Sequence, residues 1–149
     1  MRFLETADRN RYQRMTTEEL RESYLIDGMF LPGEMTLCYT DVERSIVGSA
    51  VPTTEALTLP VHKELASDFF CQRREIGVIN IGAAGNVVID GETFDMENRD
   101  SLYIGRGSKD VAFSSADAST PAQFYFVSYP AHTDYPSKLV KKEDANRLE

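Results

Sequence analysis

The amino-acid sequence predicts an all-β protein, an antiparallel β-barrel or sandwich preceded by a short helix. From Met35 onward, short runs rich in β-branched and aromatic residues alternate with turn residues. Six of the nine glycines lie between Gly77 and Gly107, where the tight turns are expected to cluster. Many short strands at close spacing are typical of an antiparallel sandwich or barrel.

The first predicted element is a short helix near the N-terminus. Thr16 and Glu19 have the spacing of a capping box, in which the threonine side chain caps the helix and the glutamate reaches back. Leu20 and Tyr24 follow at helical spacing, so we expect the helix to lie on a larger body along one apolar edge. Pro32-Gly33 then ends this region as a turn.

The strands are predicted from Thr36 onward. The run 76–82 is the most apolar and is predicted to be a central strand. Asp90-Gly91 is a strong signal for a hairpin between the runs on either side of it. The predicted strands are 36–40, 45–51, 56–59, 76–82, 86–89, 93–96, 100–104, 110–113 and 122–127.

The length of 149 residues favours a single domain with an appended segment at each end. Residues 1–34 are predicted to be a helical arm that packs on the barrel, and residues 35–137 are predicted to form the barrel itself. Residues 138–149 are highly charged and have lost the alternation of the strands, so we expect a linker or a frayed tail there.

Charge and hydropathy exclude several classes of partner. Sixteen basic and 24 acidic residues give a net charge of −8, whereas nucleic-acid affinity is built on Lys and Arg. No stretch approaches the roughly 20 apolar residues that span a bilayer, and no apolar core of a secretory signal follows the first arginines. We therefore expect a cytoplasmic protein with reduced Cys38 and Cys71, bound to neither nucleic acid nor membrane.

The order of the turns and strands resembles that of a cupin barrel, in which a Gly-x-x-Gly turn and an Asp-Gly hairpin precede a strand that ends in Gly-x-Gly. More narrowly, the chain is similar to the N-terminal half of the 5-keto-4-deoxyuronate isomerase family, the 4-deoxy-L-threo-5-hexosulose-uronate ketol-isomerases. The similarity extends from about Leu20 to Lys138. The motifs that carry it are Arg-Arg-Glu-x-Gly-Val-Ile-Asn-Ile-Gly at 73–82, Arg-Asp-Ser-Leu-Tyr-Ile-Gly-Arg-Gly at 99–107, Thr-Pro-Ala-Gln-Phe-Tyr at 120–125 and Pro-Ala-His-x-x-Tyr-Pro at 130–136.

The resemblance implies a jelly-roll cupin fold and an aldose–ketose isomerase of pectin and uronate breakdown. It also implies a keto-uronate substrate and a homo-oligomer, since the family forms hexamers. Family members are bicupins nearly twice this length, and their zinc is held by three histidines and a glutamate in the C-terminal cupin, which these 149 residues do not include. We therefore expect the metal-free N-terminal half of such an isomerase. The alternative is a stand-alone, non-catalytic cupin that binds a small sugar acid.

The metal-binding pattern of a cupin is not met in this sequence. That pattern has His-x-His, a Glu a few residues later and a further His, because two imidazoles one residue apart on a strand share a face. Aligned with it, Phe69 and Cys71 take the positions of the paired histidines. Ile76 takes the position of the carboxylate, or Glu75 does with a one-residue shift. We therefore expect no catalytic metal and no other cofactor in this chain.

A few residues remain as candidates for chemistry on a keto-uronate. A ketol isomerisation needs an acid and a base, and Glu75 and His132 have the appropriate side chains. Guanidinium and ammonium groups suit the substrate carboxylate. The substrate-binding candidates are Arg73, Arg74, Arg106, Lys109 and Tyr135. The alternatives are structural: the cations pair with nearby carboxylates at the barrel ends, and the proline-rich segment around His132 packs at a domain or subunit interface.

Overall fold

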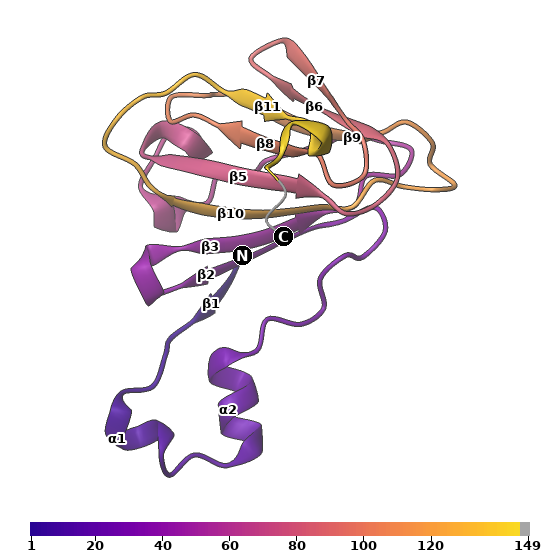
Figure 1. The fold of residues 1–149 in the computed structure, drawn as a ribbon. Helices are drawn as coiled ribbons and strands as arrows, with labels where there is room; N and C mark the ends of the chain where they lie inside the picture. The colour runs from indigo at the N-terminus through magenta and orange to yellow at the C-terminus, as the bar shows by residue number, and fades with distance from the viewer. Residues whose placement is uncertain (147–149) are drawn as a thin grey trace.

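The structure, a computed structural model, describes residues 1–146 and consists of two β-sheets with a helical arm (Figure 1). The nine predicted strands correspond to β2 through β10, which confirms the all-β prediction. The strands are β1 (Arg2–Leu4), β2 (Met35–Thr40), β3 (Ile46–Ala50), β4 (Leu57–Thr58), β5 (Arg74–Asn80), β6 (Gly85–Ile89), β7 (Glu92–Met96), β8 (Ser101–Ile104), β9 (Val111–Ser115), β10 (Phe124–Pro130) and β11 (Lys138–Val140). The helices are α1 (Arg9–Tyr12), α2 (Thr17–Tyr24) and the short 3-10 helices η1 (Val42–Arg44), η2 (Lys63–Leu65), η3 (Phe70–Gln72) and η4 (Lys142–Asp144).

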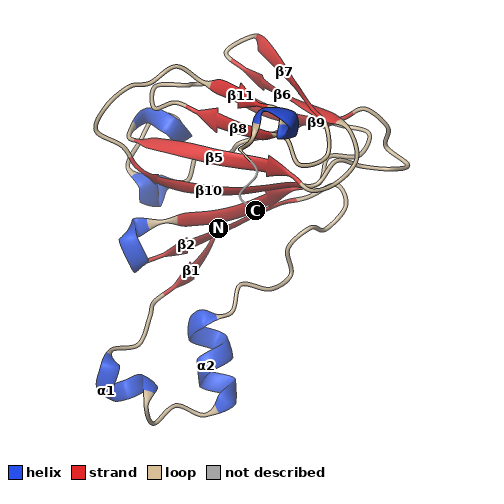
Figure 2. Ribbon diagram, in the orientation of Figure 1, coloured by secondary structure: helices blue, strands red, loops and turns tan. Residues whose placement is uncertain are grey.

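The larger sheet has seven strands in the order β1-β2-β3-β10-β5-β8-β11, and the smaller has four in the order β4-β9-β6-β7 (Figure 2). All neighbours are antiparallel except β1 and β2, which are parallel. Strand β5, predicted to be central, pairs with both β10 and β8. Because β3, β10 and β5 are distant in sequence, their pairing depends on long-range contacts.

The core lies where the inner faces of the two sheets meet. Along β5 and β10, side chains alternate between buried and more exposed, as expected for strands with one face on a core. Phe113 of β9 packs against Phe124 and Phe126 of β10, with ring centroids 5.3 and 5.7 Å away. Gly48 of β3 lies under the Phe126 ring, where a Cβ atom would collide with it. Aromatic packing between the sheets therefore fixes how closely β3, β9 and β10 approach.

The predicted hairpin at Asp90-Gly91 is confirmed. Both residues have positive φ, 49° at Asp90 and 89° at Gly91, as a two-residue type I′ turn requires. The turn joins β6 to β7 with Ile89 opposite Glu92. The Asp90 carboxylate also accepts hydrogen bonds from the backbone N–H groups of Lys109 and Asp110, which ties the turn to the loop before β9. The hairpin is thus stabilised by its own backbone and by a neighbouring loop.

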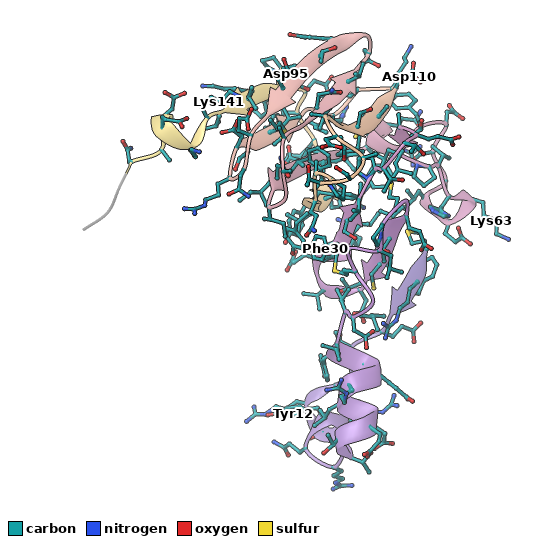
Figure 3. The ribbon with its side chains drawn as sticks, turned by 90° about the vertical axis from the view of Figure 1, so that its right-hand side faces the viewer. Tyr12, Phe30, Lys63, Asp95, Asp110 and Lys141 are labelled. Carbon is teal, nitrogen blue, oxygen red and sulfur yellow. The ribbon has the colours of Figure 1, made fainter. Side chains whose placement is uncertain are left out.

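The helical arm differs in part from the prediction. The capping box is confirmed: the Glu19 N–H donates to Thr16 Oγ1 at 3.2 Å, and the Thr16 N–H donates to Glu19 Oε2 at 2.8 Å. However, α1 and α2 extend away from both sheets, as two views show (Figures 1 and 3), and α2 buries no residue. Tyr24 donates instead to the Ala7 carbonyl within the arm. The segment is attached to the barrel by β1, by the contact of Thr6 with Asp41, and by backbone hydrogen bonds of Phe30 and Gly33 just after α2. No helix among residues 1–146 is long and apolar enough to cross a membrane.

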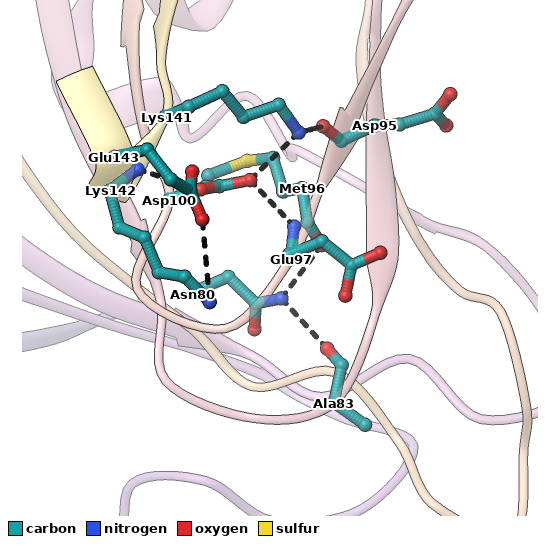
Figure 4. A network of polar contacts seen from close by, with 9 residues as sticks. All are labelled: Asn80, Ala83, Asp95, Met96, Glu97, Asp100, Lys141, Lys142 and Glu143. Atoms are coloured by element: carbon teal, nitrogen blue, oxygen red, sulfur yellow. Dashed lines mark hydrogen bonds and ion pairs between the residues drawn. The ribbon is translucent and has the colours of Figure 1, made fainter.

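The segment expected to be a charged linker begins instead as a strand. Residues 138–140 form β11, which pairs with β8 at the edge of the larger sheet. Lys141 Nζ then donates to Asp100 Oδ2 at 2.8 Å, and the Lys142 N–H donates to Asp100 Oδ1 at 3.0 Å (Figure 4). The prediction of a linker is wrong at residues 138–140, because a strand this short shows no clear alternation. The charged residues that follow it, Lys141 and Lys142, contact Asp100 and do not form a solvated tail. The remaining expectation, for residues 147–149, lies outside the described residues.

The Asp100 carboxylate, whose side chain is 1% exposed, is the buried charge that anchors this C-terminal segment. It also accepts from the Glu97 N–H at 2.8 Å. Burial by itself would raise the pKa of Asp100, but the hydrogen bonds from Lys141, Lys142 and Glu97 outweigh it and hold the pKa below its ordinary value. The carboxylate therefore stabilises the fold in its ionised form.

Replacing Asp100 with alanine is expected to lower the free energy of unfolding by about 2–3 kcal/mol, since three donors lose a buried acceptor while Lys141 stays partly solvated. Chemical denaturation measures this loss. Because the folded pKa of Asp100 is lowered, its stabilisation is present at neutral pH and is lost as the pH falls through that pKa. The gap between wild type and variant should therefore close in acid. Asp144→Ala, at an exposed carboxylate of the same segment, is the control, and an equal loss there would contradict the assignment.

Candidate functional site

Strand β5 begins with two charged residues that point to opposite faces of the larger sheet. Arg74 is buried on the inner face, and Glu75 lies half-buried on the outer face, as the alternation of a strand requires. Glu75 Oε2 accepts a hydrogen bond from the Tyr103 hydroxyl of β8 at 2.8 Å. The outer site is a cavity of about 170 Å³, lined by Glu75, Pro130, Ala131, His132, Thr133 and Tyr135.

The loop after β10, which supplies most of this lining, is held in place by Arg106. Its Nε forms an ion pair with Asp134 Oδ1 at 2.8 Å, and its Nη1 donates to the Ala131 carbonyl at 2.9 Å. The same loop crosses closely over Gly105, where a Cβ atom would collide with the Tyr135 carbonyl. Because Gly105 of the Gly-x-Gly motif has no side chain, the loop after β10 can lie close to the end of β8. This places Tyr135 in the lining of the outer site.

The Tyr103–Glu75 pair gives the outer site a fixed carboxylate. Burial raises the pKa of Tyr103 to about 12, with the hydrogen bond to Glu75 and its negative charge acting in the same direction. Tyr103 therefore remains a protonated donor at neutral pH and holds one oxygen of Glu75. The other oxygen of Glu75 has no hydrogen-bond partner within the described part of the chain. Chemically, such a carboxylate can accept a hydrogen bond from a ligand hydroxyl or take up a proton.

A second cavity, the mouth site, opens on the inner face of the sheet at the same end of β5. It has a volume of about 210 Å³ and is lined by Tyr39, Arg44, Glu64, Leu65, Ser67, Arg73, Arg74 and Pro130. The lining contains more positive than negative side chains, although the whole chain carries a net charge of −8. Pro130 contributes to both cavities, so they lie on either side of the end of β10.

The structure divides the predicted site residues between these two cavities. Glu75, His132 and Tyr135 come together in the outer site, although the last two are more than fifty positions from Glu75 in sequence. Arg73 and Arg74 line the mouth site. None of these placements tests a catalytic or binding role, so the assignments of Glu75 and His132 to acid–base chemistry stay predictions.

The two remaining candidates lie apart from both groups. Arg106 is engaged in the ion pair with Asp134, which fits the structural alternative of cations paired with carboxylates. Lys109 is exposed beside the Asp90 turn, where its backbone N–H rather than its side chain makes the contact. The expected pairing of Arg74 with a carboxylate is also not formed among residues 1–146.

Sequence reasoning missed several residues of these sites. Tyr103 lies in a predicted strand, and no local pattern marks its hydroxyl as the group that positions Glu75. Tyr39 and Arg44 line the mouth site through the β2–β3 hairpin, and no local motif marks them. The sequence feature that could have indicated Tyr39 and Arg44 is the β2–β3 hairpin, because the turn of a hairpin lies at one end of the barrel. Which end that is depends on the pairing of β3 with β10, a contact between residues far apart in sequence.

The two positions aligned with cupin metal ligands belong to the interior of this barrel. Cys71 and its neighbour Phe70 are part of the hydrophobic core, and Phe69 is partly buried beside them. Burial raises the pKa of the Cys71 thiol to about 12, so the sulfur is neutral rather than the thiolate that binds metals. No group of three or more His, Cys, Asp or Glu side chains suited to a metal ion occurs within residues 1–146.

Both cysteines should therefore resist modification by a thiol reagent at mildly alkaline pH. Burial raises the pKa of Cys38 as well as that of Cys71, and both side chains are enclosed. Titration with a chromogenic disulfide is expected to detect no thiol in the folded protein and two after unfolding in guanidinium chloride. Rapid labelling of the folded protein, traced to Cys71 by a Cys71→Ser variant, would show that this position is open rather than part of the core.

Solved structures with a similar fold and low sequence identity include a cupin domain. The E. coli protein Ylba has a TM-score of 0.57 at 12% identity, over 83% of this chain and 51% of that one. A Cupin_2 domain of an XRE family transcriptional regulator from Enterobacter cloacae has a TM-score of 0.50 at 13% identity, over 66% and 98%. These similarities confirm the cupin fold and carry no argument about function.

Curated relatives are much closer in sequence. A protein from Formosa agariphila is 50% identical over 133 residues, 89% of this chain and 48% of its own length. Relatives from Lachnoclostridium phytofermentans and Escherichia coli O139:H28 are 48% and 41% identical, over 90% and 89% of this chain. All three are named 4-deoxy-L-threo-5-hexosulose-uronate ketol-isomerase, and the chain spans about half the length of each. Since the KduI/IolB family model matches residues 31–149 as well, the chain belongs to the KduI/IolB family.

Proposed function

We propose that this chain is the N-terminal, metal-free cupin half of a ketol-isomerase acting on 4-deoxy-L-threo-5-hexosulose-uronate. The observation that carries the proposal is the 41–50% identity to proteins of that name along about nine-tenths of the chain. The product is 3-deoxy-D-glycero-2,5-hexodiulosonate. The reaction is an aldose–ketose isomerisation, in which a proton leaves the hydroxyl-bearing carbon and one is delivered to the neighbouring aldehyde carbon, while the hydroxyl proton moves between the two oxygens.

In this proposal the outer site is where this half reaches the substrate of the whole enzyme. Glu75 has a carboxylate held by Tyr103, and His132 and Tyr135 lie in the same cavity. By residue type, Glu75 takes up the proton from carbon and His132 exchanges a proton with the carbonyl oxygen. The cavity of about 170 Å³ is open toward the outside of the barrel, so a partner cupin is needed to enclose a six-carbon acid there.

The outer face of the larger sheet supports a contact with another cupin or with further copies of the chain. Next to the outer site lies an apolar hollow of about 330 Å³, lined by Gly77, Val78, Ile79, Ser101, Leu102, Tyr103, Tyr125, Val127 and Val140. Exposed apolar patches of this kind mark protein–protein contacts. Tyr103 lines the hollow with its side chain and holds Glu75 with its hydroxyl. A partner seated in the hollow would therefore border the outer site.

The proposal is tested by fusing this chain to the remaining half of the Formosa agariphila relative, in place of that protein's own matching segment. The fusion is expected to isomerise 4-deoxy-L-threo-5-hexosulose-uronate, and the 149-residue chain alone is expected to be inactive. In the fusion, Glu75→Gln should lower kcat by about 100-fold with little change in KM, the size typical of a lost general base. Glu92→Gln, at an exposed carboxylate of the smaller sheet, is the matched control.

Three results would contradict this proposal or part of it. Full isomerase activity of the 149-residue chain alone would show that the catalytic machinery is complete here. A folded fusion without activity would favour the alternative, a non-catalytic cupin that binds a small sugar acid. If Glu75→Gln leaves kcat unchanged, the outer site takes no part in the reaction, although the chain still belongs to the family.

The proposed homo-oligomer predicts a second outcome, measured by light scattering coupled to size-exclusion chromatography. Val127→Glu places a charge in the apolar hollow and is expected to convert an assembly into a monomer, because a buried unpaired carboxylate is strongly unfavourable. Val88→Glu, half-buried in the smaller sheet, is the control and should leave the mass unchanged. Circular dichroism verifies that both variants are folded. An unchanged mass for Val127→Glu, or a monomeric wild-type protein, would contradict the use of this face.

A further inference from the structure

The most unusual charge in the molecule is the guanidinium of Arg74, which is buried without a counter-ion. The residue is 7% exposed, and no carboxylate among residues 1–146 forms an ion pair with it. Burial is the main influence on its pKa, which it lowers, and nearby Arg44 acts in the same direction. Enclosing a charge in this way is costly unless hydrogen bonds or a bound anion compensate it.

Neutral groups hold two of the three guanidinium nitrogens and leave the third free. Nε donates to Ser128 Oγ at 3.0 Å, and Nη2 donates to the carbonyl oxygens of Ser128 and Arg44 at 2.8 and 2.7 Å. Nη1 makes no hydrogen bond within the described part of the chain. No fully buried side-chain nitrogen or oxygen of residues 1–146 lacks a partner, so Nη1 is not completely enclosed. Because Arg74 lines the mouth site, we take Nη1 to be the atom that faces this cavity.

The backbone at Glu43 and Arg44, beside this arrangement, is strained. Glu43 and Arg44 have φ of 53° and 52°, in the left-handed region that non-glycine residues avoid. The turn they form delivers the Arg44 carbonyl to Arg74 Nη2, and its side chain to the rim of the mouth site. Strain of this kind persists where surrounding contacts enforce it, and it is common at ligand sites.

We propose that the mouth site binds a small hydroxycarboxylate whose carboxylate group contacts Arg74. Nη1 offers a charge-assisted hydrogen bond in a partly desolvated position, where such bonds are strong. Arg44 and Arg73 add two exposed positive charges at the rim. Neither forms a side-chain ion pair among the described residues, so both guanidinium groups are available to an anion.

The remaining polar side chains of the site favour a hydroxy acid over an inorganic anion. Glu64 lines the same cavity as the three arginines and offers a carboxylate that accepts hydrogen bonds from hydroxyl groups. The same charge would repel a phosphate dianion. Tyr39 and Ser67 supply hydroxyls that donate or accept. A volume of about 210 Å³ accommodates an acid of about six carbons.

The mouth site is separate from the proposed isomerase chemistry. Arg74 and Glu75 project to opposite faces of β5, and the mouth site contains neither Glu75 nor His132. Binding at Arg74 therefore does not require that this half take part in catalysis. A failure of the isomerase proposal leaves the mouth site intact, and the reverse also holds.

The test is calorimetric titration of the 149-residue protein with D-galacturonate, a stable six-carbon hydroxy acid, and with D-galactose, its uncharged counterpart. Galacturonate is expected to bind and galactose is not. The double variant Arg44→Gln/Arg73→Gln removes only exposed side chains and should weaken binding at least about tenfold, the loss expected when charge-assisted contacts are removed. Arg21→Gln, an exposed arginine of the arm, is the matched control and should bind as the wild type does.

A second readout addresses Arg74 directly, since Arg74→Lys could fail to fold. In nitrogen-15 spectra, the Nε–H signal of Arg74 should shift when galacturonate is added, because Nη1 of the same guanidinium gains a partner. The proposal is overturned by absence of binding, by equal binding of galactose, or by unchanged affinity in the double variant. Displacement of galacturonate by an equal concentration of inorganic phosphate would overturn the assignment to a hydroxycarboxylate.

Discussion

The alternation of side chains along β5 is the constraint on which both candidate sites depend. Because β5 is paired on both edges, with β10 and β8, its register cannot shift by one residue without exposing Ile76 and Val78. That register sends Arg74 into the barrel and Glu75 to the outer face. Each charged side chain then meets different neighbours: Ser128 and the Arg44 carbonyl inside, and the Tyr103 hydroxyl outside.

Two buried charges show how differently the same fold handles ionised groups. Asp100 is compensated within the chain, since Lys141 and two backbone N–H groups donate to it, and the result is an anchor for β11. Arg74 is held only by a hydroxyl and by carbonyl dipoles, with one nitrogen unpaired. A buried charge that is fully satisfied stabilises structure, whereas one that is partly satisfied retains capacity for a ligand. Asp100 therefore anchors β11, and Arg74 keeps one nitrogen for the ligand proposed for the mouth site.

The interior of this cupin is filled with apolar side chains. Phe70 and Cys71 pack into the core where a cupin metal site would begin, and the polar groups with free capacity lie at the barrel mouth and on the outer face. The apolar hollow beside Glu75 adds a surface suited to a partner. These surfaces agree with the proposed role as one half of a larger enzyme, and the chain spans about half the length of the relatives it matches.

Local sequence patterns determined the capping box at Thr16, the hairpin at Asp90-Gly91 and the nine strands β2 to β10, because each depends on residues that are neighbours in the chain. Residue types also marked Glu75, His132 and the arginines at 73 and 74. Only the tertiary structure decided that His132 lies beside Glu75, that Arg44 supplies a carbonyl to Arg74, and that residues 138–140 add a strand. These contacts join segments tens of residues apart, and no local periodicity encodes which strands pair across such distances.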